Sequence, residues 1–166
     1  MPTLIGIPIL TLAVMLQSAI LSRITLLQAS ADLVLVVVAS WIIQERVKAV
    51  WEWAVMAAIL VGFVSQVPWW GYLIGYVGLA GLGIALKRRV WRAPLLALFT
   101  IVFLGSLGMQ MLIYAILRIQ GTVIDPFQAF NLVILPGVLL NLLLALPING
   151  LMREVAAWFY PEALEN

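Results

Sequence analysis

Charged residues are sparse along this chain, and the windows between them are long and apolar. Uncharged residues fill 1–22, 53–86, 93–117 and 126–152. An α-helix needs about 20 predominantly apolar residues to cross the hydrocarbon core of a bilayer, which is about 30 Å thick. The pattern therefore predicts membrane-spanning helices rather than the one-sided apolar stripes of helices on a soluble domain.

One further uncharged window, residues 33–44 between Asp32 and Glu45, is much shorter. It is too short to cross the hydrocarbon core. A span here must therefore use residues 31–46 and let the charged side chains at its ends reach the membrane interfaces. A buried re-entrant segment is the alternative interpretation of the same window.

The window 53–86 is too long for one span, and a turn is expected in its middle. The stretch 65–71 contains Pro68 and Gly71, which interrupt a helix, and two adjacent tryptophans, which are typical of a membrane–water boundary. We therefore expect two helices, at about 53–67 and 70–86, joined by a tight turn.

The last window is divided by the pair Pro136–Gly137. Before it, Asp125–Pro126 supplies a capping side chain followed by proline at the first helical position, which predicts the start of a helix. We expect a short interfacial helix at about 126–134 and a separate span at about 136–153. The tail, 154–166, is expected to rest on the membrane surface.

These windows predict an all-α integral membrane protein, a six-transmembrane-helix bundle that forms a single domain over residues 1–166. The expected spans are about 4–22, 31–46, 53–67, 70–86, 93–117 and 136–153. The first span is expected to be retained rather than cleaved. No basic residue precedes it, and its apolar run exceeds the 7–15 residues of a secretory signal.

Basic residues gather on one side of this topology. Six spans put both termini on the same side, together with the loops 45–52 and 87–92. That side carries Arg46, Lys48, Lys87, Arg88, Arg89, Arg92 and Arg153, whereas the opposite side carries Arg23 and Arg118. The positive-inside rule then predicts that both termini are cytoplasmic. The basic loop 87–92 is interpreted as topology control, with contact to anionic lipid or a cytoplasmic partner as the alternative.

Composition narrows the possible functions. Hydrophobic residues make up 65% of the chain and charged residues 10%, against roughly 25% charged in a soluble domain. Histidine and cysteine are absent from the sequence, which removes the commonest general base, the commonest metal ligand and all thiolate chemistry. We expect no catalytic residue, no cofactor, no metal and no nucleic-acid partner.

Few polar side chains fall inside the expected spans: Gln17, Ser18, Ser40, Ser65, Gln66, Gln110, Asn141 and Asn149. An unpaired amide in hydrocarbon costs several kcal/mol, so each is expected to face another helix or a partner. For Asn141 the first expectation is an interhelical hydrogen bond, and a binding site is the alternative. Ionisable residues lie outside the spans or, like Asp32, at the border of one, and Asp32 and Asp125 are expected at the outer face as helix caps. This argues against a pump, an ion-coupled transporter or an intramembrane protease.

Small residues recur at helical spacing in two of the expected spans. They are Gly71, Gly75 and Gly78 in the fourth span, and Gly105 and Gly108 in the fifth. Because hydrocarbon is as apolar as leucine, membrane helices associate through close packing, which small residues permit. These faces are therefore expected to pack against neighbouring helices or a partner.

Three stretches of the sequence carry a family resemblance. Residues 31–38, Ala-Asp-Leu-Val-Leu-Val-Val-Val, are similar to a Pro-Asp-Leu-Val-Leu run that opens a second span. Residues 62–75 resemble glycine-rich third and fourth helices, and residues 135–153 resemble a last span. The family is MreD, the small membrane subunit of the bacterial rod-shape machinery. The chain departs from it at Ala31, where the family often has proline, and at Ser65 or Gln66, near which it often has an acidic residue.

The resemblance implies a non-enzymatic role and a fold similar to the substrate-binding S-components of energy-coupling-factor transporters. It implies a multi-pass protein of the bacterial cytoplasmic (inner) membrane. It also implies binding to MreC, and to RodA, a class B penicillin-binding protein and the actin-like MreB, in a complex that directs side-wall peptidoglycan synthesis. The glycine faces and the last span around Pro136 and Asn141 are then the expected contact surfaces. A vitamin-capturing transporter subunit is the alternative, but such a site needs several convergent polar groups, and the sequence offers few.

Overall fold

Helices form nearly all of the chain. The computed structural model describes residues 2–21, 25–26, 29–44, 47, 49–89 and 93–160. Its elements are α1 (Pro2–Leu16), the π-helix η1 (Gln17–Leu21), β1 (Thr25–Leu26), β2 (Ala29–Ser30), α2 (Leu33–Ile43), α3 (Val50–Val64), α4 (Trp69–Arg89), α5 (Pro94–Ile119), α6 (Pro126–Gln128), the π-helix η2 (Ala129–Ile134) and α7 (Leu135–Phe159).

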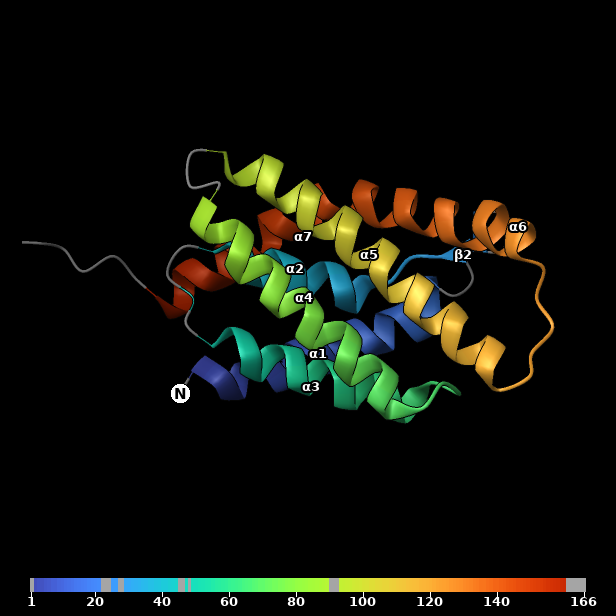
Figure 1. Ribbon diagram of the computed structural model, residues 1–166. Helices are drawn as coiled ribbons and strands as arrows, with labels where there is room; N and C mark the ends of the chain where they lie inside the picture. The colour runs from blue at the N-terminus through green and yellow to red at the C-terminus, as the bar shows by residue number, and fades with distance from the viewer. Residues whose placement is uncertain are drawn as a thin grey trace, which may run out of the picture.

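The long helices run back and forth along one axis (Figure 1). The N-terminus, the C-terminal ends of α2, α4 and α7, and the starts of α3 and α5 lie at one end of the bundle. The α3–α4 turn and the connection from α5 to α6 lie at the other end. Each helix in this series therefore runs opposite to the one before it, as the alternating pattern of loops predicts.

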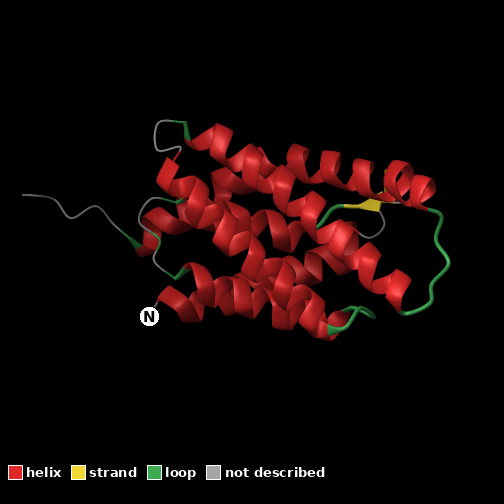
Figure 2. Cartoon of the chain, viewed as in Figure 1, coloured by secondary structure: helices red, strands yellow, loops and turns green. Residues whose placement is uncertain are grey.

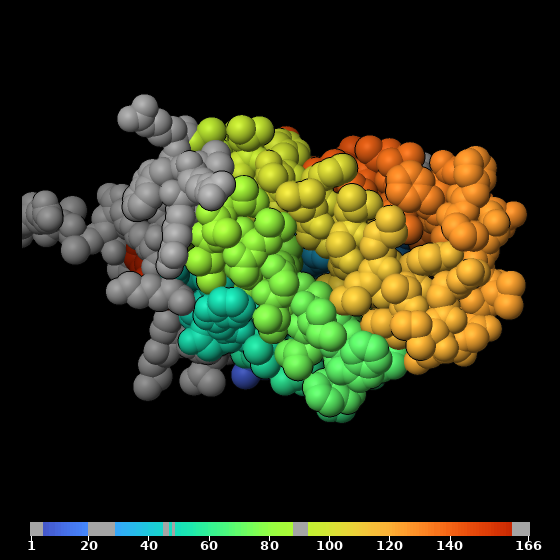
Figure 3. Space-filling view, viewed as in Figure 1, coloured from blue at the N-terminus to red at the C-terminus, as the bar shows by residue number. Residues whose placement is uncertain are grey.

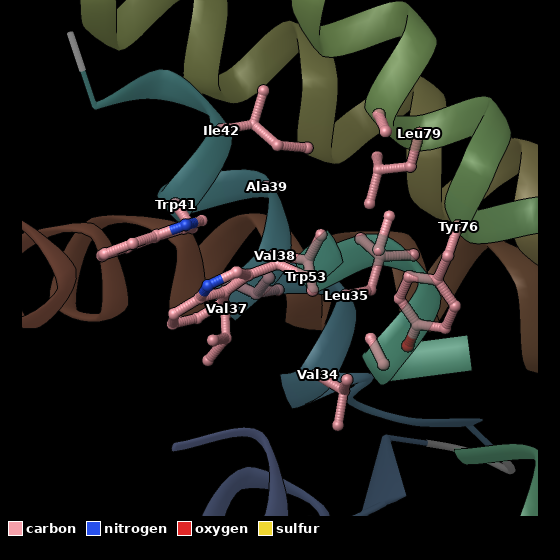
Figure 4. Packing of buried hydrophobic residues seen from close by; sticks show 14 of the residues in the cluster. Val34, Leu35, Val37, Val38, Ala39, Trp41, Ile42, Trp53, Tyr76 and Leu79 are labelled. Atoms are coloured by element: carbon pink, nitrogen blue, oxygen red, sulfur yellow. The ribbon is translucent and has the colours of Figure 1, made fainter. Parts of the chain in front are cut away.

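Helix α2 is the centre of the bundle. It packs against α1, α3, α4, α5 and α7, and ten of its residues, Leu33 to Ile42, are buried. Its sequence explains this position, because a helix that is apolar on every side belongs in an interior. Figure 4 shows its side chains meeting Trp53 from α3 and Tyr76 and Leu79 from α4.

Three helices are long and apolar enough to cross a membrane. They cover Trp69–Lys87, Pro94–Ile119 and Pro126–Phe159, and they correspond to the expected fourth, fifth and sixth spans. The helices at the expected first, second and third spans are shorter, at 15 residues or fewer in their α-helical parts. The long helices indicate a membrane protein.

The expected turn in the middle of the window 53–86 is confirmed. Helix α3 ends at Val64 and α4 begins at Trp69. Gly62 makes this turn tight, because a Cβ there would lie 2.9 Å from the Cβ of Trp69 and 3.1 Å from its Cα.

The expected break at Pro136–Gly137 is wrong. Helix is continuous from Pro126 to Phe159, with the π-helical turn η2 just before Pro136. A proline ring inside a helix clashes with the carbonyl four residues earlier. For Pro136 that carbonyl lies in the π-helical turn η2, whose wider backbone accommodates the ring. Gly137 serves packing, since a Cβ there would lie 2.5 Å from the amide nitrogen of Gln110.

The expectation of a surface-bound tail is also wrong for its first residues. Glu154 to Phe159 continue α7 without interruption. The remainder of that expected segment, 161–166, lies outside the described residues.

A short antiparallel hairpin precedes α2 and was not expected from the sequence. Thr25 pairs with Ser30, and Leu26 pairs with Ala29. Both strands contact α7, and β2 also contacts η2. Figure 2 shows this strand, in yellow, among the helices. The chain therefore enters the bundle in non-helical form before α2 begins, and α2, at Leu33–Ile43, is shorter than the expected span 31–46.

A buried polar cluster at the start of helix α2

The N-terminal end of α2 lies at the mid-length of the neighbouring helices. The backbone N–H of Asp32 donates to Oδ1 of Asn141 at 2.7 Å, and Nδ2 of Asn141 donates to Oγ of Ser106 at 2.8 Å. Ser106 is the thirteenth of the 26 residues of α5. Because α5 is long enough to cross a membrane, the start of α2 lies near the middle of that crossing.

Side-chain oxygens cap this end of the helix. The N–H of Val34 donates to Oε1 of Gln17 at 3.1 Å, and the N–H of Leu35 donates to Oδ1 of Asp32 at 3.0 Å. The first N–H groups of any helix lack partners within the helix, and an unpaired N–H away from water is costly. The cluster therefore provides hydrogen-bond acceptors for the first N–H groups of this interior helix, from its N-cap residue, from η1 and from α7.

The prediction that Asp32 caps a helix is confirmed. Asp32 was expected at the outer face, but it lies level with Asn141 and Ser106, at the mid-length of α5, rather than at an end of the bundle. An ionisable side chain therefore lies within the bundle, which removes one reason for excluding an ion pathway. Asp125, in contrast, is exposed and caps α6 as predicted, with the N–H of Gln128 donating to its Oδ2 at 2.9 Å.

Two tyrosines of α4 face this region. Tyr76 is fully buried, and its hydroxyl faces and interacts with the Asp32 carboxylate. One turn earlier, the hydroxyls of Tyr72 and Ser65 lie 2.7 Å apart. In Figure 4 the Tyr76 ring reaches from α4 toward the first turn of α2.

The interhelical hydrogen bond expected of Asn141 is confirmed. Its partners are Asp32, which was expected to cap a helix, and Ser106, which the sequence did not single out. Ser106 was missed, although it lies between Gly105 and Gly108 on a face expected to pack closely. Tyr76 was missed because only amides and serines were considered as polar residues of the spans. The spacing of Tyr72 and Tyr76, one helical turn apart, was the available signal.

The opposite end of α2 is also held by polar contacts. Nε2 of Gln44 donates to the carbonyl of Ser40 at 3.1 Å and to Oδ1 of Asn149 at 3.2 Å, and the Lys87 ammonium donates to the Gln44 carbonyl. Asn149 thus makes the interhelical contact expected of it. Lys87, which belongs to the expected basic loop 87–92, therefore contacts the C-terminal end of α2 in addition to carrying a positive charge. The side chains of Arg88, Arg89 and Arg92 lie outside the described residues.

The glycines expected to pack divide into two groups. A Cβ on Gly71, Gly75 or Gly105 would lie 2.5 Å or less from Ile116, Met109 or Leu79 respectively, so these three glycines let α4 and α5 pack closely. The packing prediction is confirmed for them.

Gly78 and Gly108 are exposed, with no atom within 4 Å of a Cβ added at either position. For packing within the chain, the prediction is wrong at these two positions. Leu79 rather than Gly78 fills the α4–α5 contact, because Leu79 continues the stripe of Gly71 and Gly75 at a spacing of four residues.

The chemistry of the cluster is that of a hydrogen-bonded oxygen network. It holds one carboxylate, from Asp32, and the basic side chains of the described residues lie elsewhere. Lys87 contacts Gln44, and Arg118 donates to the carbonyl of Ile124 at 3.2 Å. Within the described residues, no group of three or more His, Cys, Asp or Glu side chains is gathered for a metal ion.

The fold and the cluster define an all-α protein with membrane-length helices packed around a short interior helix. Comparison with family models, curated proteins and solved structures finds no match to the chain. The resemblance to the MreD family therefore stays a prediction that depends on residues 31–38, 62–75 and 135–153.

Proposed function

We propose that this chain is a non-catalytic membrane scaffold of the bacterial cell-elongation complex, which binds MreC and helps to organise side-wall peptidoglycan synthesis. One observation carries the proposal. The two stretches with the clearest family resemblance, 31–38 and 135–153, are in direct contact through α2, α7 and the hydrogen bond from Asp32 to Asn141. The residues that resemble the family are thus those that hold this fold together.

The proposed topology has six membrane passes with both termini in the cytoplasm. The C-terminal ends of α4 and α7, which carry Lys87 and Arg153, lie at the same end of the bundle as the N-terminus (Figure 1). In this topology α1 and η1 form the first pass, over residues 2–21. The hairpin and α2 together form the second pass, and the non-helical part of this pass contacts α7 and η2.

The proposed surface for MreC is the outer side of the α4–α5 seam, which faces the viewer in Figure 3, with α4 in green and α5 in yellow. Gly75 lies against Met109, and Leu79 lies against Gly105. Because the two helices are antiparallel, this register brings Gly78 and Gly108 to nearly the same level across the seam.

Exposed apolar side chains flank this seam: Ile74, Val77, Leu104 and Met111. A single transmembrane helix approaches another most closely where glycines leave its path open. Gly78 and Gly108 are therefore the proposed contact. Gly75 serves the packing within the chain.

The test is co-purification with MreC in mild detergent from a bacterial host that lacks its own MreD. Gly78→Leu and Gly108→Leu should reduce the recovery of MreC, whereas Gly150→Leu should not. Gly150 on α7 is the matched control, because a Cβ there also meets no atom within 4 Å. Undiminished recovery with both seam variants would exclude this surface.

Mass spectrometry of the wild-type complex distinguishes the two functional classes. Recovery of MreC, RodA or a penicillin-binding protein supports the scaffold. Recovery of ATP-driven transporter subunits, or of a bound vitamin, would replace the scaffold with the transporter alternative. This measurement does not depend on any variant, so it tests the function separately from the proposed surface.

A further inference from the structure

The exposed apolar surface of the bundle is much shorter on α3 than on α7. On α3 it extends from Trp51 to Val64, a distance of about 20 Å at the rise of an α-helix. On the continuous helix from α6 to α7 it extends from Phe127 to Leu151, about 35 Å. The hydrocarbon core of a bilayer is about 30 Å thick. Tilt accommodates the longer side in such a bilayer, whereas the shorter side does not reach across it.

Polar groups at both ends limit the apolar surface of α3. Glu52 lies exposed in the first turn of the helix. After Val64 the backbone leaves the helical conformation, and Gln66 is exposed in the turn 65–68 before α4 begins. A carboxylate or a non-helical backbone that faces lipid is unstable inside the hydrocarbon. Both ends of α3 therefore belong at the membrane interfaces.

Exposed tryptophans mark the same two levels. Trp51 lies at the start of α3 and Trp69 at the start of α4, and tryptophan is enriched at membrane–water interfaces. A Cβ on Gly62 would lie 2.9 Å from the Cβ of Trp69, so these two residues are level, and the stretch from Trp51 to Gly62 is about 17 Å long. On α4, the ring of Trp51 lies 3.9 Å from a Cβ added at Gly81, and the stretch from Trp69 to Gly81 is about 18 Å long. The two helices thus give the same short separation.

The exposed face of α3 is suited to lipid rather than to another helix. Its buried face contains small residues: Ala54, Ala57 and Ala58. Its exposed face carries bulky apolar side chains four residues apart: Trp51, Val55, Ile59 and Phe63. Helices in a membrane pack against one another through small residues, which let their backbones approach closely. Since the small residues of α3 face the bundle, the bulky ones are left to contact acyl chains.

We infer that the bundle thins the lipid bilayer beside α3. A bilayer of full thickness would place Glu52 or the turn 65–68 in hydrocarbon, which is costly. Compressing the neighbouring acyl chains costs little for each ångström. Beside α7 the bilayer keeps its full thickness, so the two sides of the chain contact lipid of different heights. The inference rests on the proposed topology, in which α3 is a membrane pass, and not on binding to MreC.

Spin labels on single cysteines test the thickness directly, because the sequence contains no cysteine of its own. The full chain is reconstituted in dioleoylphosphatidylcholine. Each label is then tested for collisions with oxygen, which concentrates at the bilayer centre, and with a water-soluble nickel chelate. The labelled variants on α3 are Val55→Cys, Ile59→Cys and Phe63→Cys. The matched controls on α7 are Leu135→Cys, Leu139→Cys and Leu143→Cys, which have the same spacing and are also exposed.

The expected result follows from the distance of each label to the end of the apolar surface. Phe63 is next to Val64, the last residue of α3, whereas Leu143 is about 12 Å from Leu151 on α7. The nickel collision rate should therefore be severalfold higher at position 63 than at position 143. The label at position 59 should collide mainly with oxygen.

Three outcomes would overturn the inference. Equal, low nickel collision rates at positions 63 and 143 would mean that the bilayer keeps its thickness beside α3. Low collision rates with both reagents at all three α3 positions would mean that protein rather than lipid covers this face. Nickel collisions as frequent at position 59 as at position 63 would mean that α3 is not a membrane pass, and this outcome alone would overturn the proposed topology as well.

Discussion

Replacing Asn141 by alanine tests whether the polar cluster holds the bundle together. The Asn141 side chain is 1% exposed, and it accepts from the N–H of Asp32 and donates to Ser106. Alanine leaves the Asp32 N–H unpaired in the interior, whereas the Ser106 hydroxyl can rotate to a carbonyl of its own helix.

The magnitude follows from these two losses. An unpaired buried donor costs about 1–3 kcal/mol, and an interhelical hydrogen bond in a membrane contributes about 0.6 kcal/mol on average, so Asn141→Ala should destabilise the fold by about 2–3 kcal/mol. The assay is equilibrium unfolding in mixed micelles of SDS and a mild detergent. Asn131→Ala is the control, because Asn131 donates only to the carbonyl of Phe127 in its own helix, and it should cost less than about 1 kcal/mol.

A double-mutant cycle with Ser106→Ala identifies the contact responsible. The coupling energy between Asn141 and Ser106 should be about 0.5–1.5 kcal/mol. If Asn141→Ala unfolds within about 0.5 kcal/mol of the wild type, a range typical of neutral surface substitutions, the cluster does not stabilise the start of α2.

Two further predictions concern packing. Gly62→Ala should destabilise the fold by about 1–3 kcal/mol, because the added methyl meets the Cα and Cβ of Trp69 rather than a flexible side-chain end. Gly78→Ala, at an open helical position, should be neutral or stabilising by up to about 1 kcal/mol in the same micelle assay. An equal loss of unfolding free energy in the two variants would contradict the register of α3 and α4. Trp53→Ala should destabilise by about 3–5 kcal/mol, because Trp53 is fully buried and stacked on Trp41 with ring centroids 4.1 Å apart. It should also remove the exciton signal of the stacked indoles from the circular dichroism spectrum, whereas Trp158→Ala, at an 85% exposed side chain, should leave both stability and signal unchanged.

The sequence predicts the position of most helices correctly, because uncharged windows limit where an apolar helix lies. The turn between α3 and α4 follows from Pro68, and the caps of α2 and α6 follow from Asp32 and Asp125. Each of these features depends on residues close together in the chain, where local backbone chemistry decides the structure.

The depth of α2 could not be predicted in the same way. Lipid and a protein interior favour the same apolar side chains, so the run from Leu33 to Ile43 does not show which of the two surrounds it. The partner that holds its start, Asn141, is 109 positions away from Asp32. The orientation of Gly78 was likewise undetermined, since three- and four-residue spacings both fit one helix face.

The contact between Asp32 and Asn141 sets an order of events during synthesis. The amide that completes the start of α2 belongs to α7, which follows α1 to α6 in the chain and leaves the ribosome after them. Until α7 is made, the N–H of Asp32 at the start of α2 lacks its partner, and α2 lacks one of the helices that it packs against. A nascent chain stalled before residue 135 should therefore be inserted in the membrane but not stably folded. It should be cleaved by membrane proteases faster than a chain that includes α7.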